Sequence, residues 1–279
     1  YTTLFRSDLN RETYNGELTL SRFPLDRFLT VDSLGSASAN FRLEGRYFSW
    51  PQAKTSVNAG IRQLFYKEHE YKDITLQATL DKTHLRGTMV SKDPDAPLDL
   101  VFRGDSLQQQ YQVGLGGYIG KVDLQALHLM QEPLTMGLKV DLQGFIWEHS
   151  AYALKARFDS LSMADSRKTY TLGSLDIDMA SDLKKTTLDV KTGDLQLTFR
   201  ADTSLAGFGE SAGKIAGIVG KQIAGKDIDM EQIKAELPVF SMHLKGDQNN
   251  AIAKFLKARN MGFRRLSLDI VDRKSTRLN

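Results

Sequence analysis

The chain of 279 residues contains no cysteine and no long apolar run. The absence of cysteine excludes disulfide bonds and thiolate metal sites, but it does not separate a reducing from an oxidising compartment. No uncharged stretch approaches the roughly 20 apolar residues that a membrane-spanning helix needs. The chain also starts at Tyr1 with neither an initiator methionine nor a signal-peptide pattern, so we expect a piece of a longer protein whose localisation signal lies upstream.

An excess of charge of one sign is also lacking, because 37 basic side chains stand against 34 acidic ones. The last residues, DRKSTRLN at 272–279, match the in-frame translation of a sequencing-library adapter, and we interpret them as read-through. They hold three basic residues and one acidic residue, so the net charge of the remainder falls from +3 to +1. Electrostatic attraction to nucleic acid then has no support, and no nucleic-acid partner is expected.

Alternation of apolar and polar residues is the pattern that the sequence does contain. It is clearest in residues 133–144, PLTMGLKVDLQG, where the apolar side chains fall on one side of an extended backbone. Lys139 and Asp141 fall on the other side, as in a strand that is buried on one face only. The apolar row of this strand consists of Met136, Leu138, Val140 and Leu142.

The same alternation recurs in about a dozen short runs separated by turn residues. No segment with helical periodicity interrupts residues 41–201, which disfavours parallel strands because their crossovers usually contain a helix. We therefore predict a mainly β fold: a long curved antiparallel meander, or an open taco-like β-groove, with a few short helices near the C-terminal end. A compact sandwich is the alternative. The runs are 16–29, 41–47, 57–61, 74–80, 85–89, 98–102, 111–115, 122–126, 133–144, 152–158, 175–179, 188–190 and 195–201, with residues 33–40 read as a connector.

Helical spacing begins after Thr203, in a window crowded with glycine. Each interior glycine costs about 1 kcal/mol relative to alanine, so this helix needs a surface to lie on, and we expect it to dock on the apolar face of the sheet. Asp229 is expected to cap a second helix that ends before Pro238, and Asn250 a third over residues 251–259. Strands at 240–244 and 266–270 complete the chain. The predicted divisions are 1–203, 204–237, 238–271 and 272–279.

The sequence contains only weak matches to known catalytic or metal-binding motifs. Residues 209–213, GESAG, match the G-x-S-x-G nucleophile elbow around Ser211. An elbow needs a parallel sheet, whereas the upstream chain is antiparallel, and His243 follows too closely for that fold. The five histidines are dispersed and form no ligand pair with each other, so no metal site and no cofactor are expected.

Several runs resemble the AsmA/TamB-type superfamily of envelope proteins, especially the TamB-like translocation and assembly module proteins of Gram-negative bacteria. The similar stretches are residues 23–46, FPLDRFLTVDSLGSASANFRLEGR; residues 71–93, YKDITLQATLDKTHLRGTMVSKD; the strand series through residue 144; and residues 237–270, LPVFSMHLKGDQNNAIAKFLKARNMGFRRLSLDI. These are degenerate repeat patterns that carry no catalytic signature.

The resemblance implies an inner-membrane-anchored, periplasmic protein whose long β-sheet carries phospholipid acyl chains in an apolar groove toward the outer membrane. It implies an N-terminal anchor and a C-terminal region that meets an outer-membrane β-barrel partner, neither of which is present in this sequence. It transfers no catalytic residues.

The leading hypothesis is therefore a lipid-conduit segment without enzymatic activity, with phospholipids as its partners. Transfer of acyl chains to the apolar face would be driven by about 25 cal/mol per Å² of buried surface. The second hypothesis is a structural or adhesive surface β-protein whose apolar face is packed core, and the third is a serine hydrolase that uses Ser211. The expected groove lining is Phe41, Leu43, Leu98, Leu100, Phe102, Met136, Leu138, Val140, Leu142, Leu195, Leu197 and Phe199.

Overall fold

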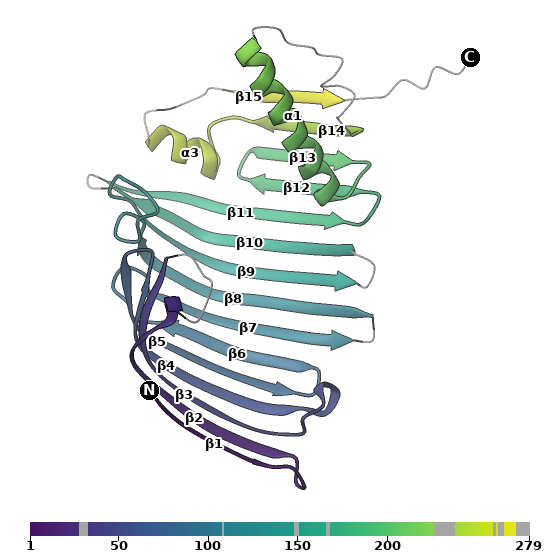
Figure 1. Cartoon of the computed structure of the whole chain (residues 1–279). Helices are drawn as coiled ribbons and strands as arrows, with labels where there is room; N and C mark the ends of the chain where they lie inside the picture. The colour runs from purple at the N-terminus through teal and green to yellow at the C-terminus, as the bar shows by residue number, and fades with distance from the viewer. Residues whose placement is uncertain are drawn as a thin grey trace. The chain divides into compact units, whose positions relative to one another are not determined.

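A computed structural model of the chain describes residues 1–27, 33–107, 109–147, 151–165, 168–225, 238–258, 261 and 265–271. These residues form fifteen strands and two α-helices (Figure 1). The strands are β1 (Thr2–Asp8), β2 (Thr13–Pro24), β3 (Leu34–Arg46), β4 (Lys54–Tyr66), β5 (His69–Asp81), β6 (His84–Ser91), β7 (Leu98–Leu107), β8 (Gln110–Asp123), β9 (Thr135–Trp147), β10 (Ala151–Ala164), β11 (Thr169–Ser181), β12 (Thr186–Thr192), β13 (Leu195–Ala201), β14 (Phe240–Gly246) and β15 (Leu266–Val271). The helices are α1 (Leu205–Gly225) and α3 (Ala251–Ala258), and short 3-10 turns lie at Leu25–Arg27 and Trp50–Gln52.

The described strands belong to one antiparallel sheet in which their spatial order is their sequence order, β1 to β15. β1 and β15 end this order and do not pair with each other, so the sheet is open. The predicted mainly β fold, an open antiparallel meander with helices near the C-terminal end, is confirmed. None of the described helices is long and apolar enough to cross a bilayer.

The chain divides into two compact units, which are described separately. Unit 1 contains Tyr1–Gln143 and Arg157–Ser174, and unit 2 contains Gly144–Ala156 and Leu175–Asn279. The predicted division at residues 203, 237 and 271 followed the change from strand to helical periodicity, whereas these units are defined by spatial contact.

In unit 1 a line of irregularities crosses the first strands. The pairing of β2 with β3 shifts register between Leu20 and Phe23, where Arg22 has a φ of 44° and donates its backbone N–H to the Ser38 hydroxyl at 3.0 Å. The pairing of β3 with β4 also shifts register, between Ser38 and Ala39. β-Bulges of this kind bend a strand and increase its twist, and Figure 1 shows these strands, in purple and blue, bending at one end.

In unit 1 aromatic rings lie over glycines of the neighbouring strand. Phe102 in β7 is directly opposite Gly87 in β6, and a methyl group added to Gly87 would overlap the Phe102 ring. Tyr14 is likewise opposite Gly45, at 2.5 Å from the position such a methyl would occupy. Because glycine has no side chain, the ring can lie directly on the neighbouring strand. This packing favours one register of the two paired strands.

Unit 2 holds the two helices: α1 packs on the sheet, and the start of α3 is tied to the β12–β13 turn. Phe208 of α1 packs edge-on against Phe199 of β13 and Phe240 of β14, with ring centroids 4.9 and 5.7 Å apart. Phe199 is only 9% exposed, so the N-terminal half of α1 covers the apolar face there. The start of α1 is tied to the β11–β12 hairpin, because Leu205 N–H donates to the hydroxyl of buried Ser181 at 2.9 Å.

Some local predictions require correction. Residues 122–126 do not form a strand of their own: β8 ends at Asp123, and its carboxylate accepts the N–H groups of Gln125 and Ala126, which closes a turn. Residues 34–40 belong to β3, although their small side chains suggested a connector, because pairing with β2 and β4 overrides their weak propensity. β1 was not predicted. The expected helix capped by Asp229 and the C-terminal residues 272–279 lie outside the described residues.

The predicted cap of α3 is confirmed. Asn250 is 1% exposed, and its Oδ1 accepts the N–H of Ala253 at 2.7 Å. Its Nδ2 donates to Asp194 Oδ1 at 2.7 Å and to the Asp247 carbonyl at 3.0 Å. One side chain therefore caps the helix and joins it to the β12–β13 turn.

Asn250→Ala should lower the free energy of unfolding by about 1–3 kcal/mol, because it removes the cap and leaves the buried N–H of Ala253 unsatisfied. Urea denaturation measures the change. Asn249→Ala, at the exposed neighbouring position, is the matched control and should change stability by less than about 0.5 kcal/mol. Equal effects of the two substitutions would contradict the role assigned to Asn250.

Candidate functional site

The sheet of unit 1 has one apolar face and one polar face, and the register of its strands carries each face from strand to strand. One row on the apolar face passes from Val57 to Ala78, Gly87, Phe102 and Leu115, each directly opposite the next. These side chains are half-buried, whereas most residues between them along each strand are exposed. Strands buried on one side only have this pattern.

A hollow of about 350 Å³ lies on the apolar face across β4–β8. Its apolar lining comes from aliphatic side chains near the strand ends, and its margin carries hydroxyl and carboxylate groups. A volume of this size is at the lower end of the range for ligand pockets, about 300–1,000 Å³. The lining residues are Thr55, Val57, Ala78, Leu80, Thr83, Leu85, Gly104, Asp105, Ser106, Tyr111, Gln112 and Val113.

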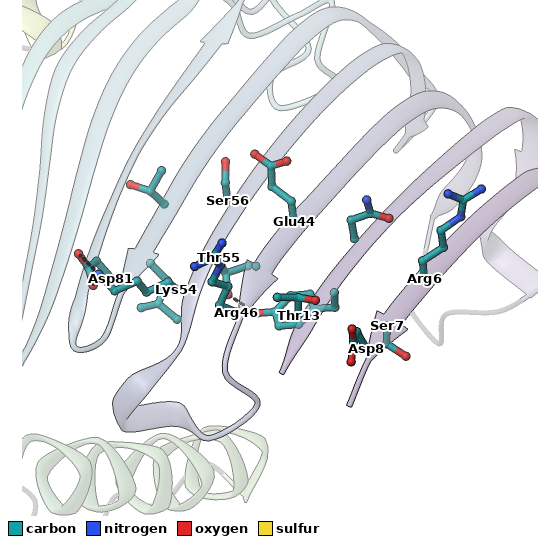
Figure 2. Close-up of a pocket in the computed structure, with 15 residues that line it drawn as sticks. Arg6, Ser7, Asp8, Thr13, Glu44, Arg46, Lys54, Thr55, Ser56 and Asp81 are labelled. Atoms are coloured by element: carbon teal, nitrogen blue, oxygen red, sulfur yellow. Dashed lines mark hydrogen bonds and ion pairs between the residues drawn. The ribbon is translucent and has the colours of Figure 1, made fainter. Parts of the chain in front are cut away.

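A larger hollow of about 690 Å³ lies over the polar rows of β1–β5 (Figure 2). Arg6, Glu44 and Ser56 extend from neighbouring strands toward the same side, and Lys54 pairs with Asp81 at 3.2 Å. Acidic and basic side chains are balanced there, so the hollow favours neither anions nor cations. The charged lining residues are Arg6, Asp8, Glu44, Arg46, Lys54 and Asp81.

The residues predicted to line a groove all lie in strands, on β3, β7, β9 and β13. Four of them are buried, with exposures of 7% for Leu100, 3% for Val140, 2% for Leu195 and 9% for Phe199. The other eight are half-buried. Those eight are Phe41, Leu43, Leu98, Phe102, Met136, Leu138, Leu142 and Leu197.

None of the twelve predicted residues lines the apolar hollow. Its aliphatic lining was missed, although Val57, Ala78, Leu80, Leu85 and Val113 show the same alternation in the sequence. Alternation tells which side chains share a face, but the point along the strands where that face is hollowed depends on neighbouring strands. In unit 2, the helix-covered packing of Phe199 makes that residue part of a core. Whether the twelve contact lipid stays a prediction.

Ser211 lies within α1, six residues after the helix begins. The local structure of the GESAG sequence is therefore helix on both sides of the serine, which differs from the strand-turn-helix geometry of a nucleophile elbow. His243 pairs instead with Asp269 of the adjacent strand, Nδ1 to Oδ1 at 3.0 Å.

An acidic residue on the polar face is held by two basic neighbours. Asp105 Oδ1 lies 2.6 Å from His84 Nδ1 and accepts a hydrogen bond from Arg86 Nη2 at 2.8 Å. Hydrogen bonding to Arg86, then to His84, holds the pKa of the Asp105 carboxyl below its usual value, because both bonds favour the charged form. This group joins β6 to the end of β7.

Metal-ligating side chains converge at one place among the described residues. A nitrogen of His69 and carboxylate oxygens of Asp93 and Asp95 all lie within 4.8 Å of one another. In the sequence the histidines form no ligand pair with each other, so a site made of one histidine and two aspartates was not expected.

Comparisons with known proteins identify no relative: no protein-family model, no curated protein and no solved structure matches the chain.

The lowered pKa of Asp105 predicts how its contribution to stability depends on pH. A carboxyl whose folded-state pKa is depressed adds stability above its unfolded-state pKa, about 3.9, and loses it as the pH falls through the folded value. Asp105→Asn should therefore lower the free energy of unfolding by about 1 kcal/mol at pH 7, since its partners are half-exposed. The difference between wild type and variant should shrink at acidic pH. Asp141→Asn, an exposed position, is the control, and a pH-independent difference for Asp105→Asn would contradict the assignment.

Proposed function

We propose that the chain is a lipid-conduit segment, without enzymatic activity, that shelters phospholipid acyl chains on the apolar face of unit 1. The observation that carries the proposal is the continuous row of half-buried apolar side chains across β4–β8, together with the hollow of about 350 Å³ beside it. All described strands belong to a single sheet, so a second sheet does not account for that face within the described residues.

The energetics favour an acyl chain as the occupant. Each methylene group transferred from water to an apolar surface gains about 0.8 kcal/mol, and the hollow fits only a short apolar segment. A row that continues across neighbouring strands would provide successive places of similar affinity, as carriage along a sheet requires. The polar face would remain in water, since Lys139 and Asp141 are exposed.

The resemblance of the repeat patterns to AsmA/TamB-type proteins adds the biological setting to the proposal. In that setting the chain works in the periplasm of a Gram-negative cell envelope, anchored to the inner membrane, and passes phospholipids toward the outer membrane. The phospholipid headgroup would stay at the hydrated margin of the apolar face, near hydroxyl groups such as those of Thr83 and Ser106.

One observation favours the alternative of a structural β-protein with a packed face. In unit 2 the apolar face bears α1, and Phe208 packs onto Phe199 and Phe240. If unit 1 served only as a core in the same way, its apolar face would hold no lipid. Lipid binding by variants at Leu80 separates the two functions.

Leu80→Asp should reduce bound phospholipid about tenfold or more, because a charge in the apolar hollow costs well over the 1.4 kcal/mol that corresponds to a factor of ten. Lipid is measured by extraction and mass spectrometry of the purified chain and by titration with a fluorescent phospholipid. Thr79→Asp is the matched control: the residue is exposed on the opposite face, and its cross-strand neighbour is Arg86. It should bind like the wild type.

Leu80→Trp tests the same site without adding charge, because the larger ring fills the hollow while keeping it apolar. It should also lower lipid binding, and circular dichroism should show an intact sheet in all three variants. A wild-type chain that neither carries phospholipid nor binds the fluorescent probe would overturn the proposal in favour of a packed face.

A further inference from the structure

A buried histidine and two aspartates meet at the start of β5. His69 is the first residue of β5 and follows a two-residue turn in which Lys67 and Glu68 have φ values of 48° and 65°, the geometry of a tight hairpin turn. Asp93 and Asp95 lie in the loop between β6 and β7. His69 is 8% exposed and Asp93 is 1% exposed.

Backbone N–H groups fix the carboxylate of Asp93. Its Oδ2 accepts the N–H of Lys72 at 2.7 Å, just beyond the last paired residue of β6, so the side chain extends the ladder where the strand has ended. Its Oδ1 accepts the N–H groups of Asp95 and Ala96 at 2.9 and 3.1 Å. The loop thus wraps around this carboxylate. These hydrogen bonds fix the position of the Asp93 carboxylate before any ligand binds.

His69 points into this group without making a hydrogen bond. Its Nε2 is buried and lacks a hydrogen-bond partner among the described residues, and it lies 3.6 Å from Asp93 Oδ1, too far for a hydrogen bond. The Tyr71 ring packs edge-on against the imidazole, with centroids 4.5 Å apart. Burial, and then the negative charge of Asp93, raise the pKa of the Tyr71 phenol. A buried nitrogen left unpartnered is rare in folded proteins, and a bound ion or water at this point would satisfy it.

We propose that His69, Asp93 and Asp95 bind a divalent transition metal ion, with Zn²⁺ the best fit. Zinc bonds of about 2.0–2.2 Å to nitrogen and oxygen place two ligands of a tetrahedral ion about 3.4 Å apart, close to the 3.6 Å between His69 Nε2 and Asp93 Oδ1. The carboxylate oxygen of Asp95 lies within 4.8 Å of both and supplies the third ligand. Imidazole selects zinc-like ions over Mg²⁺ and Ca²⁺.

Such an ion would join the start of β5, which pairs only with β4 at this point, to the β6–β7 loop, which lies outside the strands. Two carboxylates balance its charge, and solvent reaches the site through half-buried Asp95, which leaves a fourth position for water. The inference is independent of the proposed lipid function, because none of the three residues lines the apolar hollow.

The test is Zn²⁺ binding by the full chain, measured by isothermal titration calorimetry after chelator treatment. The wild type should bind one Zn²⁺ and unfold at a higher temperature when the ion is present. His69→Gln and Asp95→Asn should each weaken binding by about tenfold or more, since each removes a ligand. If His69→Gln fails to fold, Asp95→Asn still tests the site. Its effect on folding should be small, because no described hydrogen bond uses the Asp95 side chain.

His84→Gln is the matched control, since His84 also lies beside an aspartate but outside the cluster. It should leave Zn²⁺ affinity unchanged. In histidine nitrogen NMR spectra, Zn²⁺ should shift Nε2 of His69 and leave His84 in place. Equal Zn²⁺ affinity of the wild type and both ligand variants, or no binding to the wild type, would overturn the proposal.

Discussion

Each strand of the sheet hydrogen-bonds to the strand that follows it in the sequence, and a slip of one residue in any pair would turn the side chains of that strand to the opposite face. The apolar row from Val57 to Leu115 exists because four successive registers agree. Gly87 leaves room for the Phe102 ring, where any larger residue would overlap it, and this is a steric reason for one register over another. The two faces, and the hollows on them, follow from this agreement.

The two units differ in what covers the apolar face of the sheet. In unit 2, Phe208 packs α1 onto the sheet, where buried Ser181 holds its start. Buried Asn250 ties the start of α3 to the β12–β13 turn. In unit 1 some apolar residues, such as Leu134 and Met163, are fully buried, but the row from Val57 to Leu115 is only half removed from water. That intermediate burial is the physical basis for proposing a ligand in unit 1 rather than in unit 2.

Sequence reasoning predicted the fold class and the faces because alternation is a local property that each strand carries by itself. Residues 133–144 show this well: Val140 is buried, and Lys139 and Asp141 are exposed. Prediction failed where pairing partners decided the outcome, as in residues 34–40, whose small side chains gave no strand signal.

The sites depend on proximity that alternation does not encode. The hollow beside Leu80 depends on how β4–β8 end together, and His69 meets Asp93 only because β5 and the loop after β6 lie side by side. A sequence search for paired histidines therefore missed a histidine whose partners are carboxylates more than twenty positions away.

The strictly sequential strand order bears on how the chain acquires its structure. Each new strand finds its partner in the segment that emerged just before it, so no distant segment has to arrive before pairing can begin. Loop-closure costs stay small when neighbours in sequence are neighbours in space, and stability can accumulate hairpin by hairpin as in repeat proteins. Such a sheet can lengthen by the addition of hairpins at either edge without disturbing the strands already in place.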